Sequence, residues 1–332
     1  MPISSFFSSL PSIPLPSFVS LIPLYESYLK LRFTHHLGLS SRIVKVSPSA
    51  SLHFWSTAAP SDRPVLVLLH GFGPTASALH QFPVGLLRDL SERFRLVIPD
   101  LLFFHPGSTT TSSDRSELSQ AAAIVGLLDA IHVEQFHLLG TSYGGFVACR
   151  VASTCGTERV GKVVVASSGV NMRRRNNEEL ARKAGVEHVE EVLMPETPAR
   201  LRRLLELAVW SPKISRILPD FALGDALNKM YLPNRKEKLE LLKGLTLGRD
   251  DTPNITSLEQ DVLLIWGEED QLFPLEMALE LKEILGKKVK LEVIRKTSHV
   301  PQIEHPKKFG KLVIDFLCGS DQIPSNSQRV RL

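Results

Sequence analysis

The pentapeptide Gly140-Thr141-Ser142-Tyr143-Gly144 constrains the fold of this chain more than any other segment. An apolar run precedes it, and a stretch of small residues typical of a helix follows it. A strand, a sharp turn and a helix form the setting in which a G-x-S-x-G sequence lifts its serine hydroxyl clear of a sheet. Glycine is needed on both sides because side chains there would collide across the turn. We therefore predict that Ser142 is a nucleophile at the end of a buried strand.

Short apolar runs alternate with helical segments along most of the chain. Two alternating segments, 42–46 and 52–56, are typical of antiparallel strands. Continuous apolar runs indicate strands buried on both faces, and they lie at 65–69, 94–99, 136–140, 160–166, 262–266 and 289–294. Helical periodicity marks 118–131, 147–152 and 306–317. The pattern predicts an α/β fold with a mostly parallel sheet and helices on both faces.

The alternation breaks after Ser168 and resumes at Val262. Residues 171–256 are charged and amphipathic, contain no strand-like run, and are divided by prolines into short helical stretches. We therefore expect a helical insertion, 171–256, between two parts of one β/α core, 41–170 and 257–318. Residues 1–40 form an apolar N-terminal segment. The polar tail, 319–332, is expected to be disordered.

Two other strand ends carry reactive side chains. Asp270 follows the 262–266 run, and His299 follows the last run. In a parallel sheet the carboxyl ends of all strands meet at one edge, so both residues should approach Ser142. A serine hydroxyl needs a base to remove its proton, histidine titrates near neutral pH, and a carboxylate fixes the histidine tautomer. We predict that Ser142, Asp270 and His299 are the catalytic residues.

The segment His70-Gly71-Phe72-Gly73 follows an earlier strand and supplies the remaining part of such a site. The backbone N–H of Phe72, together with that of Tyr143, is expected to form an oxyanion hole. One donor of this kind contributes about 3–4 kcal/mol to transition-state stabilisation. His70 is interpreted as a structural residue that holds this loop.

Several other polar residues compete for a role. Glu268 and Glu269 are alternatives to Asp270, which is favoured by its distance from Gly267 and by the Phe273-Pro274 pair that follows it. Asp100 also ends a strand but precedes the Ser142 turn, so it is expected to shape a loop. His80 and His105 are expected at the surface or in the core rather than in the site.

The first 24 residues carry no charged side chain, and prolines at 11, 14, 16 and 23 interrupt any long helix. A membrane-spanning helix, a secretory signal and a transit peptide are all disfavoured, because the segment lacks an uninterrupted apolar core and early basic residues. Two interpretations stay open: a segment packed on the domain, or peripheral contact with an intracellular membrane. We expect a cytoplasmic protein.

Composition excludes several functions. The formal net charge is only +4, and aromatic residues are not interleaved with basic runs, so no nucleic-acid partner is expected. Cys149, Cys155 and Cys318 are too few and too scattered for a disulfide framework. The histidines lack metal-ligand spacing, so neither a metal nor another cofactor is expected. The basic triplet 173–175 is interpreted as an exposed helix start.

Together these residues and their order resemble the α/β-hydrolase family over roughly residues 40–318. The resemblance implies that the insertion is a helical cap that covers the site. His70-Gly71-Phe72-Gly73-Pro74 and 140–145 are similar to monoacylglycerol lipase-like enzymes and to carbon–carbon-bond hydrolases of meta-cleavage products. The whole chain looks like a plant member. The meta-cleavage enzymes usually have an asparagine after the oxyanion glycines, where this chain has His80 and Gln81, and the loop 100–108 is unusually apolar.

These departures favour an apolar ester over a dianionic dienoate. The first functional hypothesis is therefore a serine hydrolase of the carboxylic ester type (EC 3.1.1), acting on a lipophilic small molecule through an acyl-enzyme. A ligand receptor of the same fold with little turnover is the second. A carbon–carbon-bond hydrolase, lyase or acyltransferase that uses the same three residues is the third. The substrate-binding residues and the oligomeric state are not predicted.

Overall fold

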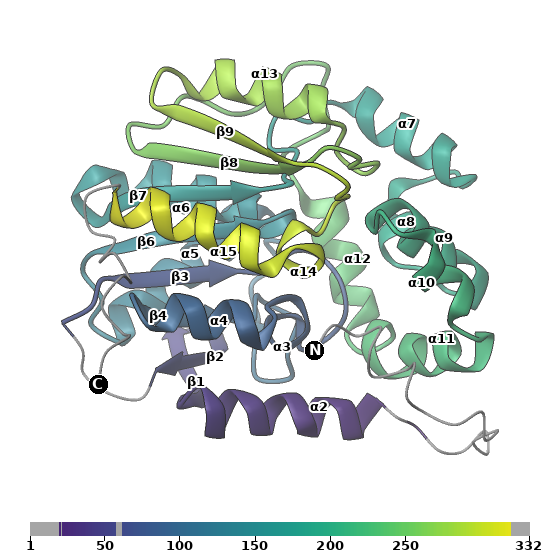
Figure 1. The fold of residues 1–332 in the computed structure, drawn as a ribbon, viewed down its shortest axis with the longest axis horizontal. Coiled ribbons are helices and arrows are strands. Elements are labelled where there is room, and N and C mark those ends of the chain that lie inside the picture. The colour runs from purple at the N-terminus through teal and green to yellow at the C-terminus, as the bar shows by residue number, and fades with distance from the viewer. Residues whose placement is uncertain (1–19, 21, 58–61, 320–332) are drawn as a thin grey trace, which may run out of the picture.

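The computed structural model describes residue 20 and residues 22–57 and 62–319. Its centre is a nine-stranded sheet in the order β1-β2-β4-β3-β6-β7-β8-β9, with the short β5 paired to β2 (Figure 1). The neighbours along β4-β3-β6-β7-β8-β9 pair in parallel, whereas β2 pairs antiparallel with β1, β4 and β5. The protein therefore has the predicted α/β architecture with a mostly parallel sheet.

The strands follow the apolar runs closely. Their bounds are β1 Leu39–Ser47, β2 Ala50–Thr57, β3 Val65–Leu69, β4 Arg95–Pro99, β5 Thr109–Thr110, β6 Phe136–Thr141, β7 Val160–Ala166, β8 Asp261–Gly267 and β9 Val289–Ile294. Three of the predicted parallel strands, β3, β7 and β9, have the predicted ends. Only β5 has no counterpart in the sequence pattern, because two residues are too few to show an alternation.

Helices cover both faces of the sheet, and the side chains of each strand divide between them. Leu66 and Leu68 of β3 pack in one apolar cluster, and Val67 and Leu69 pack in the other, as the two-residue period of a strand requires. One face holds α4 (Val84–Ser91) and α15 (Pro306–Cys318), and the other holds α5 (Glu117–Ala130), α6 (Tyr143–Arg159) and α13 (Leu275–Leu285). Every residue of β3 except the first is completely buried.

Between β7 and β8 the described chain forms helices and no strand, as expected. We call Arg174–Gly244 the helical insertion; it contains α7 Arg174–Ala184, α8 Val189–Leu193, α9 Pro198–Ala208, α10 Pro212–Ile217, α11 Asp220–Ala226, the π-helix η2 Leu227–Tyr231 and α12 Arg235–Gly244. It has an apolar cluster of its own, which also includes Leu272 of the core. Figure 1 shows it along one side of the sheet. The expected boundaries 171–256 of a separate cap stay a prediction.

The sequence predicts that the basic triplet 173–175 is exposed. The structure corrects this prediction for Arg173, which is half-buried and joins the insertion to the core. Its guanidinium makes two hydrogen bonds to Glu280 of α13, at 2.8 and 2.5 Å. Asn171 donates a further hydrogen bond to the same carboxylate at 2.8 Å. This paired arrangement lowers the pKa of Glu280, with the Arg173 hydrogen bond as the largest cause. Charge pairing across the chain, which the local sequence does not show, explains the difference.

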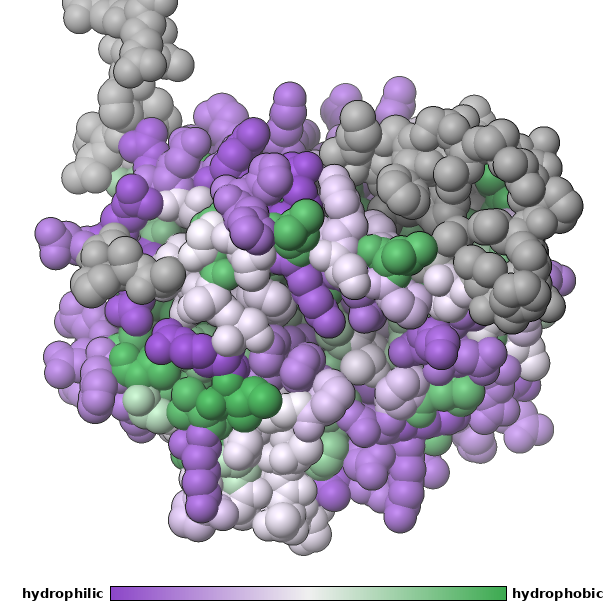
Figure 2. Space-filling view, turned by 90° about the horizontal axis from the view of Figure 1, so that it is seen from below, coloured by the Kyte–Doolittle hydropathy of each residue, from purple (hydrophilic) through white to green (hydrophobic). Residues whose placement is uncertain are grey.

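The N-terminal part of the described chain packs on the core. Helix α2 (Ile22–Leu31) and the π-helix η1 (Arg32–His36) bury Leu29 and Phe33 against the cluster that contains α4 and α15. The exposed side of α2 carries Leu24, Tyr28 and Leu31. Figure 2 views this side, where apolar and polar side chains are interspersed. The expectations for residues 1–19, and for the tail beyond Gly319, lie outside the described residues, and membrane contact stays a prediction.

No helix in the described ranges is long and apolar enough to cross a bilayer.

Gly126 on α5 tests the packing of this helix against the antiparallel edge of the sheet. A Cβ at this position would lie 2.5 Å from the carbonyl oxygen of Val46, so α5 would have to shift. We expect Gly126→Ala to lower the free energy of unfolding by about 1–3 kcal/mol in chemical denaturation. The control is Gly85→Ala on α4, where nothing lies within 4 Å. This variant should be at least as stable as the original, because alanine favours a helix.

Candidate active site

Ser142 lies in a strained turn between β6 and α6. Its φ of 51° and ψ of −120° are unfavourable for a residue with a side chain. The turn is so tight that a Cβ on Gly140 would lie 2.3 Å from the Gly144 carbonyl, and a Cβ on Gly144 would lie 2.2 Å from the Leu69 carbonyl. Both positions therefore require glycine. The sharp turn predicted from the sequence is present.

The side chains of Ser142, His299 and Asp270 form one hydrogen-bonded chain. Ser142 Oγ lies 2.9 Å from His299 Nε2, and His299 Nδ1 lies 3.0 Å from Asp270 Oδ2. An ionised carboxylate can only accept, so Nδ1 carries the proton and Nε2 is left to accept from the serine hydroxyl. His299 is buried at 8 % exposure and Asp270 at 5 %. The structure therefore brings together all three residues predicted from the order of the chain.

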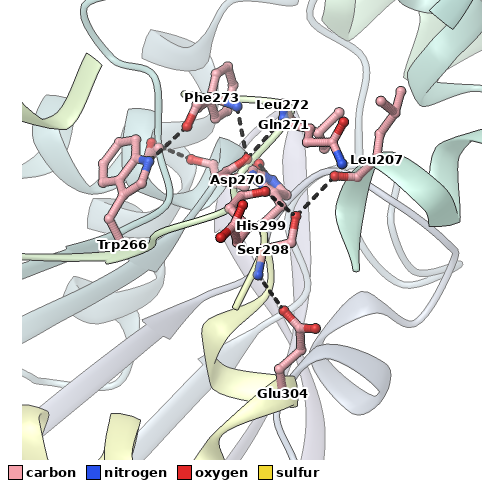
Figure 3. A network of polar contacts seen from close by, with 12 residues as sticks. Leu207, Trp266, Asp270, Gln271, Leu272, Phe273, Ser298, His299 and Glu304 are labelled. Carbon is pink, nitrogen blue, oxygen red and sulfur yellow. Dashed lines mark hydrogen bonds and ion pairs between the residues drawn. The ribbon is translucent and has the colours of Figure 1, made fainter. Parts of the chain in front are cut away.

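The turn after β8 orients Asp270. Its Oδ1 accepts hydrogen bonds from the backbone N–H groups of Leu272 and Phe273, both at 2.9 Å, and its Oδ2 remains for His299 (Figure 3). Trp266 donates its indole N–H to the Phe273 carbonyl at 2.8 Å and so closes the turn. The competing carboxylates, Glu268 and Glu269, are exposed. The geometry supports the choice of Asp270.

The loop after β3 lies against Ser142, since a Cβ on Gly71 would come within 3.0 Å of the Ser142 Cβ. His70 Nδ1 donates to the Gly71 carbonyl at 2.8 Å, and His70 Nε2 accepts from the Leu101 N–H at 3.0 Å. His70 is therefore neutral, and burial lowers its pKa. This matches the structural role expected for it.

Gln81 binds the backbone of Gly71 through both ends of its side-chain amide. Its Oε1 accepts from the Gly71 N–H at 2.8 Å, and its Nε2 donates to the Gly71 carbonyl at 3.0 Å. The Gly71 carbonyl and the Phe72 N–H belong to one planar peptide and point in opposite directions. Fixing the carbonyl therefore fixes the direction of the N–H. Within the described chain, no hydrogen bond uses the backbone N–H of Phe72 or of Tyr143.

The helical insertion directly contacts the loop between β9 and α14 (Pro301–Glu304) that carries Ser298 and His299, which we call the histidine loop. The backbone N–H of His299 donates to the carbonyl of Ala208 at 3.1 Å, and Ser298 Oγ donates to that of Leu207 at 3.1 Å. Glu304 of α14 accepts from the Ser298 N–H at 2.7 Å (Figure 3). It also accepts from the Trp210 N–H at 2.8 Å. Burial raises the pKa of Glu304. These contacts position the histidine between core and insertion.

Aromatic rings pack against Tyr143 and His299, the two residues in contact with Ser142 along the chain and through the triad. Phe72 packs edge-on against Tyr143, with ring centroids 5.6 Å apart, and against Phe104 at 5.1 Å. On the other side, Phe273 packs against the His299 ring at 5.4 Å and against Phe146 at 6.2 Å. Of these rings only Phe72 and Phe273 are partly exposed, so they are the ones that a substrate could contact.

The remaining titratable candidates form a separate group. Asp100 accepts a 2.8 Å hydrogen bond from His53 Nδ1 and a 3.0 Å bond from the Ala78 N–H, so it shapes a loop as expected. Burial acts to raise the pKa of Asp100, but the hydrogen bonds from His53 and from the Ala78 N–H contribute to a net lowering of this pKa. His105 stacks on His53, and burial lowers its pKa to about 4. His80 pairs with Glu26.

Sequence reasoning assigned no function to Gln81 or Glu304. The only signal for Gln81 was its place after the oxyanion glycines, where the resembling enzymes have an asparagine. Glu304 gave no signal, because its partners are backbone groups. Conversely, Phe72 and Tyr143 were expected as backbone donors, and the structure shows both N–H groups without a partner in the described chain.

Comparison with known proteins agrees with this geometry. The model of the alpha/beta hydrolase family matches residues 66–312, so the chain belongs to this family. Its relatives include the 2-hydroxy-6-oxononadienedioate/2-hydroxy-6-oxononatrienedioate hydrolase of Paraburkholderia xenovorans, which is 27 % identical over 83 % of this chain and 94 % of the relative.

Two solved structures show the same fold. The 2-hydroxy-6-oxo-6-phenylhexa-2,4-dienoate hydrolase of Rhodococcus sp. is 23 % identical, has a TM-score of 0.69, and is matched over 84 % of this chain and 99 % of its own. A membrane phospholipase A from a bacterium is 22 % identical, has a TM-score of 0.72, and is matched over 91 % of this chain and 94 % of its own.

Asp270→Asn tests the hydrogen-bonded chain. An amide at this position can donate to His299 Nδ1 and so favours the tautomer that cannot accept the serine proton. We expect the rate of Ser142 labelling by a fluorophosphonate probe to fall by up to about 10⁴-fold. Glu269→Gln is the matched control and should be labelled at nearly the original rate. A larger effect of Glu269→Gln would show that the wrong carboxylate was chosen.

Gln81→Met tests how Gln81 supports the loop after β3, residues 70–75, which we call the oxyanion loop. The variant keeps side-chain volume but removes both hydrogen bonds to Gly71, so the Phe72 N–H is no longer held in one direction. We expect kcat for a p-nitrophenyl ester to fall by about 10- to 100-fold with little change in KM, less than the loss of a whole donor. The exposed Gln135→Met is the control. A raised KM at unchanged kcat would assign Gln81 to substrate binding instead.

Proposed function

We propose that Ser142, His299 and Asp270 form a catalytic triad that hydrolyses a bond to a carbonyl carbon. The observation that carries the proposal is the continuous chain of hydrogen bonds, 2.9 and 3.0 Å long, that ends at a serine in a strained turn. A serine positioned in this way beside a neutral imidazole is activated for attack on a carbonyl.

The first steps follow from the geometry. Ser142 Oγ attacks the carbonyl carbon while its proton passes to His299 Nε2, and Asp270 stabilises the imidazolium that forms. The oxygen of the tetrahedral intermediate gains negative charge, and the N–H groups of Phe72 and Tyr143 are the donors available to it. The leaving fragment takes up a proton from His299. Water then attacks the acyl-enzyme with His299 as base and releases an acid.

The bond that we propose is a carbon–carbon bond next to a ketone, in a substrate of the 2-hydroxy-6-oxo-dienoate type. Support comes from the curated relatives, which are named as hydrolases of such compounds at 24–29 % identity. The absence of the asparagine that these dienoate hydrolases usually have disfavours this substrate class. However, Gln81 supplies a side-chain amide that binds the oxyanion loop. This removes the main objection from the sequence.

Cleavage of such a substrate needs no reactant other than water. In the 2-oxo tautomer, cleavage of the bond to the ketone carbon leaves an electron pair that the conjugated 2-oxo group takes up as a dienolate. The dienolate gains the proton held by His299 and becomes the 2-hydroxydienoate. The hydroxyl of water ends on the acyl carbon. For the phenyl substrate the products are benzoate and a 2-hydroxydienoate.

Ester hydrolysis is the second candidate, and the aromatic surroundings of Ser142 favour it. The partly exposed rings of Phe72 and Phe273 offer apolar contact but no charge to a lipophilic acyl or alcohol group. The same triad serves both reactions. The two candidates differ only in whether the leaving atom is carbon or oxygen.

The deciding experiment compares kcat/KM for 2-hydroxy-6-oxo-6-phenylhexa-2,4-dienoate with values for p-nitrophenyl esters of graded chain length. We expect the dienoate to be the better substrate and Ser142→Ala to lose at least about 10³-fold on every substrate. A clear preference for the esters would establish the second candidate. Tight binding with negligible turnover of all of them would instead favour a receptor, and full activity of Ser142→Ala would refute the triad.

A further inference from the structure

Lys238 of α12 is a basic side chain without solvent exposure. Its Nζ donates to Thr75 Oγ1 at 2.9 Å and to the Met230 carbonyl at 3.4 Å, and it lies 5.3 Å from the centre of the Phe104 ring. All of these partners are neutral. Lysine is almost never fully buried unless it is paired, so this position requires an explanation.

No ion pair of Lys238 is present within the described residues. By contrast Arg235, one turn earlier on α12, contacts Glu196 at 2.9 Å. Burying an ammonium without a counter-charge costs several kcal/mol, which neutral hydrogen bonds and one aromatic ring offset only in part. This cost lowers the pKa of Lys238 to about 7; burial is the larger cause and the charge of Arg235 the smaller.

The ammonium lies at the junction between the helical insertion and the oxyanion loop. Thr75 belongs to the same loop as Phe72, and its backbone N–H donates to the Met230 carbonyl at 2.6 Å. The Phe104 ring, on which Lys238 lies, contacts the Phe72 ring, and that ring contacts Tyr143 beside Ser142. The uncompensated cation is thus connected to the reaction site by a short series of packed side chains.

We propose that Lys238 and Thr75 bind the carboxylate of the substrate. The inference rests on the proposed function, and it assigns to this chain's own insertion the recognition of the charged end of the molecule. A carboxylate would supply the missing counter-charge and accept hydrogen bonds from the ammonium and the Thr75 hydroxyl. The aromatic rings would hold the apolar part.

The proposal predicts a specific pH dependence. Lys238 is charged below its pKa of about 7 and neutral above it, so recognition of a carboxylate should weaken as the pH rises past 7. The charged or titratable groups that act on Lys238 or are affected by it are Arg235 on α12 and His70 under the oxyanion loop. Arginine side chains do not titrate in this range, and burial lowers the pKa of His70. Titration of neither side chain would therefore change carboxylate recognition near pH 7.

The test uses two esters that differ only in charge: 4-acetoxybenzoate and its methyl ester. The carboxylate of the first lies on the leaving group, as it does in a dienoate. The readout is the ratio of kcat/KM for the charged ester to that for the neutral one. We expect Lys238→Met to lower this ratio by about 10- to 100-fold, as the loss of a charge-assisted hydrogen bond predicts. Lys236→Met, exposed on the same helix, should leave it unchanged.

In the original protein the ratio should decline above pH 7. In Lys238→Arg it should be flat with pH, because arginine stays charged. An unchanged ratio in Lys238→Met, including an equal loss on both esters, would overturn the proposal and leave Lys238 as a residue that merely positions the loop. The melting temperature of each variant checks that the fold is intact.

A binding measurement separates failure of the inference from failure of the proposed function. Calorimetry would compare 2-hydroxy-6-oxo-6-phenylhexa-2,4-dienoate binding to Ser142→Ala and to Ser142→Ala/Lys238→Met, where no turnover is needed. We expect the dissociation constant to rise by about 10- to 100-fold in the double variant. Equal affinity of the two variants would contradict the assignment of Lys238 whatever bond the enzyme cleaves. No binding to either variant would contradict the dienoate as substrate, and the ratio for the two esters would then decide the role of Lys238.

Discussion

The close approach of backbone atoms at the β6–α6 turn is the constraint on which the rest of the structure depends. Gly144 lies so near the Leu69 carbonyl that no side chain fits between them. β3 and β6 must therefore be neighbours, which places the loop after β3 against Ser142. The sheet then adds β7, β8 and β9 in order, and the loops after β8 and β9 bring Asp270 and His299 to the same edge. The position of the serine determines the positions of its partners.

Much of this arrangement follows from the sequence because it depends on local patterns and on one rule of topology. β3, β7 and β9 are short apolar runs bounded by polar or turn residues, and their ends in the structure are the predicted ones. The meeting of Ser142, Asp270 and His299 follows from their places after parallel strands. None of these inferences requires knowledge of which side chains touch at long range. Helix α2 was not predicted, because Pro23 and the uncharged residues before it give no sequence signal for the start of a helix.

The supporting contacts were not predictable, since each joins groups far apart in the chain or uses backbone atoms that any residue has. Gln81 binds the backbone of Gly71, Glu304 binds two N–H groups, and Arg173 pairs with a carboxylate on α13. Lys238 is a stronger case, because in the sequence it is one of several lysines on an amphipathic segment. Only the packing of α12 on the oxyanion loop shows that this one is buried and the neighbouring Lys236 is exposed.

The contacts between the helical insertion and the histidine loop bear on how enzymes of this kind diverge. Ala208 and Leu207 reach His299 and Ser298 through their carbonyl oxygens, and Trp210 reaches Glu304 through its N–H. Every residue type except proline carries both groups. The contacts to the base therefore do not depend on which side chains stand at the end of α9, although Leu207 itself is buried in the apolar cluster of the insertion. The insertion can acquire a new substrate preference while the chemistry beneath it is conserved, provided that its backbone keeps its path.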